Sequence, residues 1–178
     1  PLLLFWRLDG DSDWTSREMN EDPDGVHRSE IPGQPDGTVI EFYLRVFTDS
    51  TERTWPAPSQ ADGEQQANAL LQFDDSYDPY AIWVPGSQPK YRIVMTEEER
   101  AELADIGDDS ESPRNEEESN AEMNCTFIVE DGTGLALRYL ASVRNRGASS
   151  RNPPPNNFLV KFRSDDPWNG CPSVKFNA

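Results

Sequence analysis

Apolar and polar positions alternate in short runs through the first third of the chain, and turn residues separate the runs. The stretches LLLFWRLDG and WTSREM flank an Asp-rich turn, and TVIEFYLRVFTD is rich in β-branched and aromatic residues. Such runs are typical of half-buried strands. Short strands at this spacing, separated by Gly, Pro and Asp turns, favour a sandwich. We therefore predict an incomplete immunoglobulin-like β-sandwich over residues 1–58.

The next segment, residues 59–88, is more polar and contains several turn signals. We expect a linker with some order, in which ANALLQF could form one strand. Its aromatic residues Tyr77, Tyr80 and Trp83 either seal this connection against a neighbouring element or form an exposed platform for sugar. Both interpretations stay open.

The stretch PKYRIVMTEEERAELADIG predicts a strand followed directly by a helix. Thr96 and Glu99 have the spacing of a capping box, which satisfies two amides at a helix start. Leu103 and Ile106 form the inward stripe, and Gly107 is placed to end the helix in a left-handed conformation. The strand-like runs MNCTFIVED, LALRYLASVRNRG, NNFLVKFRSDD and PSVKFNA follow. Residues 89–178 are thus predicted to form an α+β antiparallel sheet with one short helix, and the whole chain to be mainly β.

The charge balance limits the partners of the chain. It holds 33 acidic residues against 16 Lys or Arg, a formal net charge of -17. Phosphates would be repelled over most of such a surface, so we expect no general nucleic-acid binding. No apolar run is long enough for a membrane span, so we expect no membrane insertion. A solvated acidic surface explains the charge, and calcium binding by part of it is the alternative.

One acidic cluster has the spacing of a calcium loop. Asp9, Asp11 and Asp13 alternate at the start of DGDSDW, as the first ligands of an EF-hand loop do. The sixth position, which should be glycine, is Trp14, so the EF-hand motif fails. A hairpin turn explains the same residues without a metal. Calcium at the three aspartates remains the alternative prediction.

Cys125 and Cys171 are the two cysteines, and neither belongs to a CxxC pair. With His27 as the single histidine, the chain lacks the ligand spacing of a zinc site. Both cysteines begin segments that we interpret as strands of one sheet. If the protein is secreted, a Cys125–Cys171 disulfide is expected.

The stretch VRNRGASSRNPPPNNFLVKF is basic in an acidic chain. Arg144, Arg146 and Arg151 surround a Gly-Ala-Ser-Ser turn. Guanidinium groups bind phosphate or carboxylate oxygens, and such a turn offers amides and hydroxyls. The arginines either pair with local carboxylates, such as Asp165 and Asp166, or hold an anionic ligand.

From Tyr91 onward the chain resembles the N-terminal part of the CotH kinase family, the spore-coat-type atypical kinases. The resemblance rests on YRIVMTEEERAEL, NCTFIVEDG, VRNRGASSRNPPPNNFLVKF and PSVKFNA, in this order. It covers about half of the chain. The residues before Trp55 are similar to immunoglobulin or fibronectin type III-like modules that precede such domains in large secreted bacterial proteins.

The resemblance implies an atypical kinase fold that binds ATP and Mg²⁺ in a full-length parent, whereas no cofactor is expected in the fragment itself. The residues that match the family's strand-turn are Arg144, Arg146, Gly147, Ser149 and Ser150. Lys161 falls on the following strand, where a kinase keeps a lysine that contacts phosphate. The family's metal ligands and catalytic aspartate would lie beyond Ala178, so no catalytic residue is assigned and the fragment itself is expected to be non-catalytic.

The resemblance also implies a secreted or cell-surface location and protein partners. A different class of function remains open beside it. The chain could be a structural or adhesive extracellular module that self-assembles when neighbouring copies complete its β edges.

Overall fold

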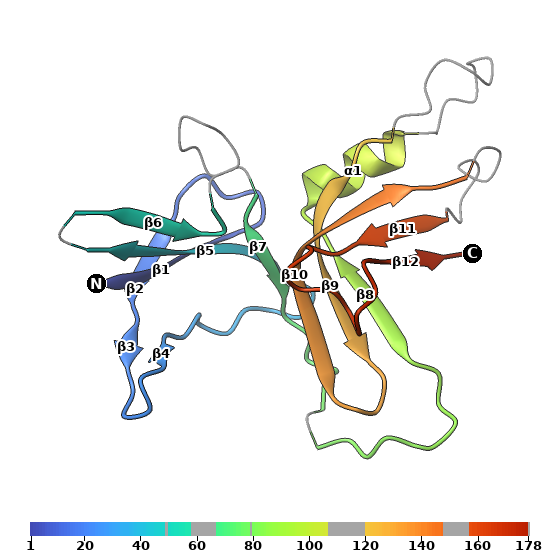
Figure 1. The fold of residues 1–178 in the computed structure, drawn as a ribbon, viewed down its shortest axis with the longest axis horizontal. Helices are drawn as coiled ribbons and strands as arrows, with labels where there is room; N and C mark the ends of the chain where they lie inside the picture. Colours follow the sequence, from blue (N-terminus) through green and yellow to red (C-terminus); the bar gives the residue numbers. More distant parts are fainter. Residues whose placement is uncertain (49, 58–66, 79, 107–119, 148–156, 178) are drawn as a thin grey trace. The chain divides into compact units, whose positions relative to one another are not determined.

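The computed structural model describes residues 1–48, 50–57, 67–78, 80–106, 120–147 and 157–177. The chain divides into two compact units, Pro1–Ile82 and Trp83–Ala178. Each unit is built on one antiparallel sheet of five strands (Figure 1). The mainly β fold with a single short helix, predicted from the sequence, is confirmed for the described residues.

The sheet of the first unit is organised around its longest strand, β5. Strand order is β2-β1-β5-β6, and β7 also pairs with β5. A two-stranded ribbon of β3 and β4 extends the unit. The strands are β1 (Leu2–Leu8), β2 (Thr15–Glu18), β3 (Asn20–Glu21), β4 (His27–Arg28), β5 (Val39–Phe47), β6 (Glu52–Trp55) and β7 (Ala69–Gln72).

β7 lies in the segment that the sequence suggested as a linker, within its possible strand ANALLQF. It belongs to the first unit because Ala69 and Leu70 are buried where β7 pairs with β5. A buried polar contact lies beside it. Glu41 on β5 accepts hydrogen bonds from Arg7 Nε at 2.9 Å and from Asn68 Nδ2 at 2.8 Å. This contact ties β1 and the residue before β7 to the central strand.

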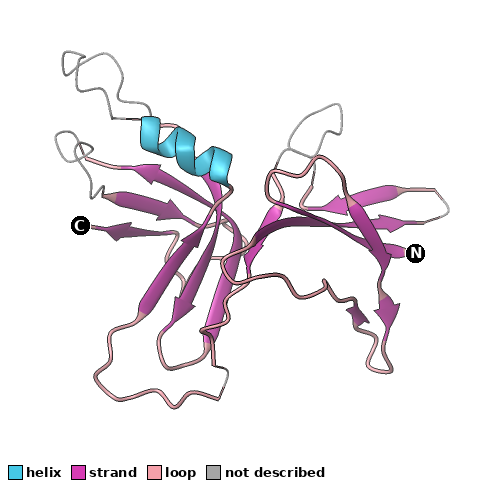
Figure 2. Ribbon diagram, turned by 180° about the vertical axis from the view of Figure 1, so that it is seen from behind, coloured by secondary structure: helices cyan, strands magenta, loops and turns pink. Residues whose placement is uncertain are grey.

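The second unit is a sheet in the order β12-β11-β10-β9-β8, with every neighbouring pair antiparallel. One helix, α1, follows β8 and packs against one end of one face of the sheet (Figure 2). The elements are β8 (Lys90–Val94), α1 (Glu97–Asp105), β9 (Met123–Glu130), β10 (Leu135–Asn145), β11 (Phe158–Lys161) and β12 (Ser173–Phe176).

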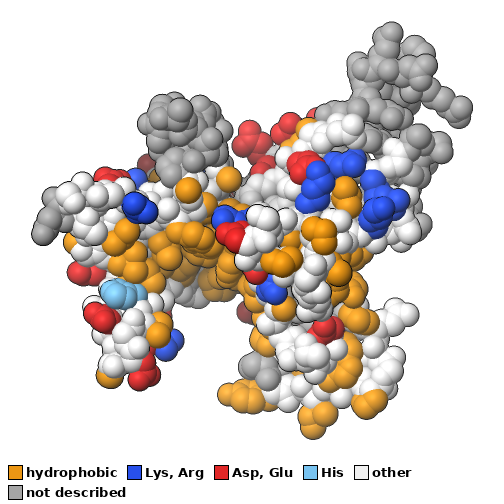
Figure 3. Space-filling model, in the orientation of Figure 1, with side chains coloured by type: hydrophobic (Ala, Val, Ile, Leu, Met, Phe, Trp, Pro, Cys, Tyr) orange, Lys and Arg blue, Asp and Glu red, His pale blue; other side chains and the backbone are white. Residues whose placement is uncertain are grey.

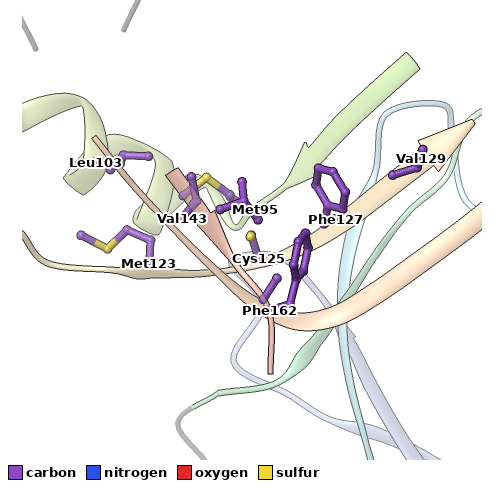
Figure 4. Packing of buried hydrophobic residues seen from close by; sticks show 10 residues of the cluster. Met95, Leu103, Met123, Cys125, Phe127, Val129, Val143 and Phe162 are labelled. Atoms are coloured by element: carbon purple, nitrogen blue, oxygen red, sulfur yellow. The ribbon is translucent and has the colours of Figure 1, made fainter. Parts of the chain in front are cut away.

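The core of the second unit lies between α1 and this face of the sheet. Side chains of a strand alternate between faces. The alternate positions Met123, Cys125, Phe127 and Val129 of β9 therefore all join one buried cluster, to which Leu103 of α1 also belongs (Figure 4). Aromatic rings extend the cluster: Phe127 contacts the rings of Tyr91, Phe162, Trp168 and Phe176.

The start of α1 shows the predicted N-cap, Thr96, with one of the two amide contacts expected of the capping box. The Glu99 amide donates to Thr96 Oγ1 at 3.2 Å, and the Glu99 carboxylate accepts from the Asn124 amide at 3.0 Å, which links the helix to β9. Leu103 is buried, and Ile106 packs against the core. Gly107, predicted to end the helix, lies outside the described residues. The helix ends at Asp105 with Ile106 as its C-cap.

Candidate anion-binding face

The face of the second sheet opposite α1 carries basic side chains from three adjacent strands. Residues directly opposite each other in an antiparallel pair share a face. Arg144 of β10 pairs with Leu159 of β11, which pairs with Lys175 of β12. Lys161 of β11 pairs with Ser142 of β10. Since Val143 and Asn145 point into the core cluster or towards α1, these basic residues point to the other side.

Arg146 lies at the end of the same strand group. Its amide donates to Asn157 O at 2.9 Å, and its guanidinium Nη1 donates to Asn177 Oδ1, one residue beyond β12. We call Arg144, Arg146, Lys161 and Lys175 the basic face. Figure 3 shows Lys and Arg side chains gathered over β10 and β11 on the visible side of the second unit.

One carboxylate, that of Glu122, lies among these cations. It accepts a hydrogen bond from Ser142 Oγ at 2.7 Å and another from Lys161 Nζ. Arg144 Nε lies 3.9 Å from Glu122 Oε1, and Arg144 Nη1 donates to Asn120 Oδ1 at 3.0 Å. Burial acts to raise the pKa of Glu122, but the hydrogen bonds from Lys161 and Ser142 and the nearby positive charges outweigh it, so this pKa is lowered. The carboxylate is therefore held ionised at neutral pH.

The sequence predicted Arg144, Arg146 and Lys161 as binding residues, and the sheet register brings all three to one face. Gly147 follows directly with a φ of 101°, a conformation that suits glycine. Ser149 and Ser150 lie outside the described residues, so their predicted role stays a prediction. Lys175 was not predicted. The alternation in PSVKFNA, combined with the pairing of β12 and β11, is the signal that identifies it.

Asp165 and Asp166, which the sequence suggested as partners of the arginines in the basic stretch, pair with other arginines instead. Asp165 is bound by Arg163, through Nε at 2.9 Å and Nη2 at 2.8 Å, and Asp166 lies 3.0 Å from Arg138 Nε. Neither aspartate pairs with Arg144 or Arg146, because the tight turn after β11 keeps Asp165 beside Arg163.

The two remaining predicted sites are the calcium cluster of Asp9, Asp11 and Asp13 and the Cys125–Cys171 disulfide. Asp11 and Asp13 are exposed in the β1–β2 hairpin, and no group of three His, Cys, Asp or Glu side chains that could hold a metal occurs among the described residues. Cys125 and Cys171 are free thiols, so the predicted disulfide is not formed in this structure. Cys125 points into the core from β9, whereas Cys171 is exposed in the turn before β12.

A scan against protein-family models, a search of curated proteins and a search of solved structures each found no match to this chain. The resemblance to the CotH kinases therefore stays a prediction. Among the described residues, no helix is long and apolar enough to cross a membrane.

Proposed function

We propose that the second unit binds phosphate groups through its basic face, as the non-catalytic leading part of a secreted or cell-surface protein similar to the CotH kinases. The observation that carries the proposal is the position of four cations on one sheet face, two of which, Lys161 and Arg144, lie beside the carboxylate of Glu122, in a chain with a net charge of -17. In an acidic chain, such a local excess of positive charge favours a ligand of opposite sign.

The donor set suits phosphate oxygens. Arg144 supplies a planar guanidinium with several N–H donors, Lys161 supplies a compact ammonium, and Ser142 supplies a hydroxyl. They come from two paired strands, so the backbone positions of the donors are fixed by ladder hydrogen bonds. A site on paired strands holds its donors at more constant distances than a site on a loop does.

The ion pair of Lys161 with Glu122 adds to this argument. In protein kinases a strand lysine contacts the nucleotide phosphates. Here a strand lysine at the position expected from the family resemblance already binds the oxygens of an anionic group, the Glu122 carboxylate. The ligand class that we propose is therefore a nucleotide such as ATP, with its phosphates on the basic face.

Calorimetric titration of Mg-ATP into the wild type and into Lys161→Met tests the proposal. We expect millimolar affinity, on the order of −4 kcal/mol, and its loss in Lys161→Met. Lys90→Met is the matched control, because Lys90 is also an exposed strand lysine paired with a glutamate, Glu130, at 3.5 Å. Equal Mg-ATP binding by the wild type, Lys161→Met and Lys90→Met would reject the proposal. Absence of binding by the wild type and by variants with Glu122 replaced would reject it as well.

Self-assembly through β edges is the second candidate. β12 and β8 are the end strands of the second sheet, so each has one edge without a strand partner in the described sheet. However, β12 is four residues long and carries Lys175, and short, charged edge strands disfavour pairing with other chains. A concentration-dependent shift to larger species in size-exclusion chromatography would support assembly, and a monomer at micromolar concentration would exclude it.

A further inference from the structure

Glu122 lies beside Lys161 and Arg144 of the basic face and makes the contacts that an anionic ligand would make. Its two carboxylate oxygens accept from Lys161 and from Ser142 at 2.7 Å, and Arg144 Nε lies at 3.9 Å. All three donors lie on β10 and β11, whereas Glu122 lies just before β9 begins. The donors thus form a preformed oxyanion site from two strands, and a side chain from a third segment fills it.

We propose that Glu122 is an internal competitor of the ligand: its carboxylate holds the position of a ligand phosphoryl group and must leave when the ligand binds. This inference rests on the proposed phosphate-binding function and adds the residue that controls the affinity of the site. A carboxylate and a phosphate group offer oxygens of similar spacing to the same donors, so they exclude each other.

The position of Glu122 allows this exchange. It precedes the first ladder position of β9, and its side chain is 31% exposed. A rotation about its side-chain bonds can therefore move the carboxylate into water without breaking the backbone ladder of the sheet. Lys161 and Arg144, with side chains 47% and 23% exposed, remain reachable from solvent.

The competition also defines the class of ligand. A ligand with one negative charge gains little over the carboxylate that it displaces. A ligand with two or more charges gains additional attraction from Lys175, because its strand β12 lies only about 5 Å from β11, and from Arg146, which lies two residues after Arg144. The site should therefore prefer polyphosphates such as pyrophosphate or a nucleotide triphosphate over inorganic phosphate, and phosphate over acetate.

The test compares the full chain with its Glu122→Gln variant, with pyrophosphate as the probe in calorimetry. Glutamine keeps the size of the side chain and can still accept from Ser142, but it carries no negative charge. We expect binding about five- to tenfold tighter than in the wild type, which corresponds to the loss of one charged competitor. Glu130→Gln, which removes the partner of Lys90 from the same sheet, should leave the affinity unchanged.

Three results distinguish the competitor role of Glu122 from the proposed phosphate-binding function on which it rests. Equal or weaker pyrophosphate binding by Glu122→Gln, with measurable binding by the wild type, overturns the competitor role and leaves phosphate binding intact, since Glu122 would then position Lys161. Absence of binding in both proteins rejects the phosphate-binding function itself. A larger rise of the melting temperature with added pyrophosphate in Glu122→Ala than in the wild type supports the competitor role independently, and an equal or smaller rise opposes it.

Discussion

At the scale of single residues, Asn145 connects the basic stretch to the helix. It lies between Arg144 and Arg146, but its side chain is 1% exposed and points to the α1 side of the sheet. Its Nδ2 donates to Leu103 O at 2.8 Å and to Ile106 O at 2.9 Å. These carbonyls at the helix C-terminus have no partner within the helix, so a strand side chain satisfies them.

Replacing Asn145 should therefore destabilise the second unit. Asn145→Ala leaves two helix carbonyls without this donor, and we expect the free energy of unfolding to fall by about 1–3 kcal/mol. Urea denaturation followed by circular dichroism measures the change. Asn20→Ala, at an exposed position of β3, is the control and should change stability by less than about 0.5 kcal/mol. Equal stability of both variants would contradict the capping role.

The two cysteines differ in reactivity for a physical reason. Burial, together with the negative charge of Glu99, raises the pKa of the Cys125 thiol to about 12. The thiolate is the reactive species, so Cys125 should resist alkylation in the folded protein, whereas the exposed Cys171 should react.

Iodoacetamide labelling followed by mass spectrometry measures this difference. One adduct on Cys171 is expected in native protein at pH 8, and two adducts are expected in denaturant. Labelling of neither cysteine under denaturing, non-reducing conditions would instead show that protein from its native source contains the disulfide predicted from the sequence.

At the scale of elements, the turn between β9 and β10 depends on a glycine. Gly132 has a φ of 86°, and the ring of Trp83 lies where a side chain would begin: a Cβ at this position would be 2.6 Å from Trp83 Cγ. Trp83 thus packs against the turn, as one of the two interpretations of the aromatic residues proposed. Tyr80, by contrast, is 89% exposed.

Gly132→Ala should lower the free energy of unfolding more than Gly10→Ala, which serves as the matched control. Gly10 has nearly the same φ, 85°, but nothing lies within 4 Å of its Cβ position. Both alanine variants incur the cost of a left-handed backbone, about 1–2 kcal/mol, and only Gly132→Ala also displaces Trp83. We expect a larger loss of unfolding free energy for Gly132→Ala, together with a change in tryptophan fluorescence. Equal losses of unfolding free energy in the two variants would mean that the Trp83 ring moves aside without a measurable loss of stability.

At the scale of the whole molecule, the charge of -17 is divided unevenly over the surface. The basic face gathers four of the 16 Lys or Arg residues, three on strands β10 to β12 and Arg146 directly after β10, so acidic residues dominate elsewhere. Self-repulsion of a large net charge destabilises a compact fold, and exposed ion pairs contribute little in return.

Salt should therefore stabilise this protein. Sodium chloride at 1 M shortens the screening length to about 3 Å, from about 10 Å at 0.1 M. We expect the melting temperature to rise by several degrees between these concentrations, measured by scanning calorimetry. Potassium chloride should have the same effect, because the mechanism is screening. A fall in melting temperature with either salt would show that the attractive pairs outweigh the repulsion.

The sequence by itself determined the local structure. Alternation and turn residues identified most strands, and Thr96 with Glu99 identified the helix start, because these signals depend on residues a few positions apart. The basic stretch itself indicated the arginines, and the resemblance to the CotH kinases implied that Lys161 acts with Arg144 and Arg146. The tertiary structure decided what depends on strand pairing and packing: that β7 returns to β5, that Lys175 joins the basic face, that Asn145 reaches the carbonyls at the end of α1, and that Glu122 is the partner of Lys161. Glu122 and Lys161 are 39 positions apart. Such a contact follows from the order and register of β9, β10 and β11, which no local pattern encodes.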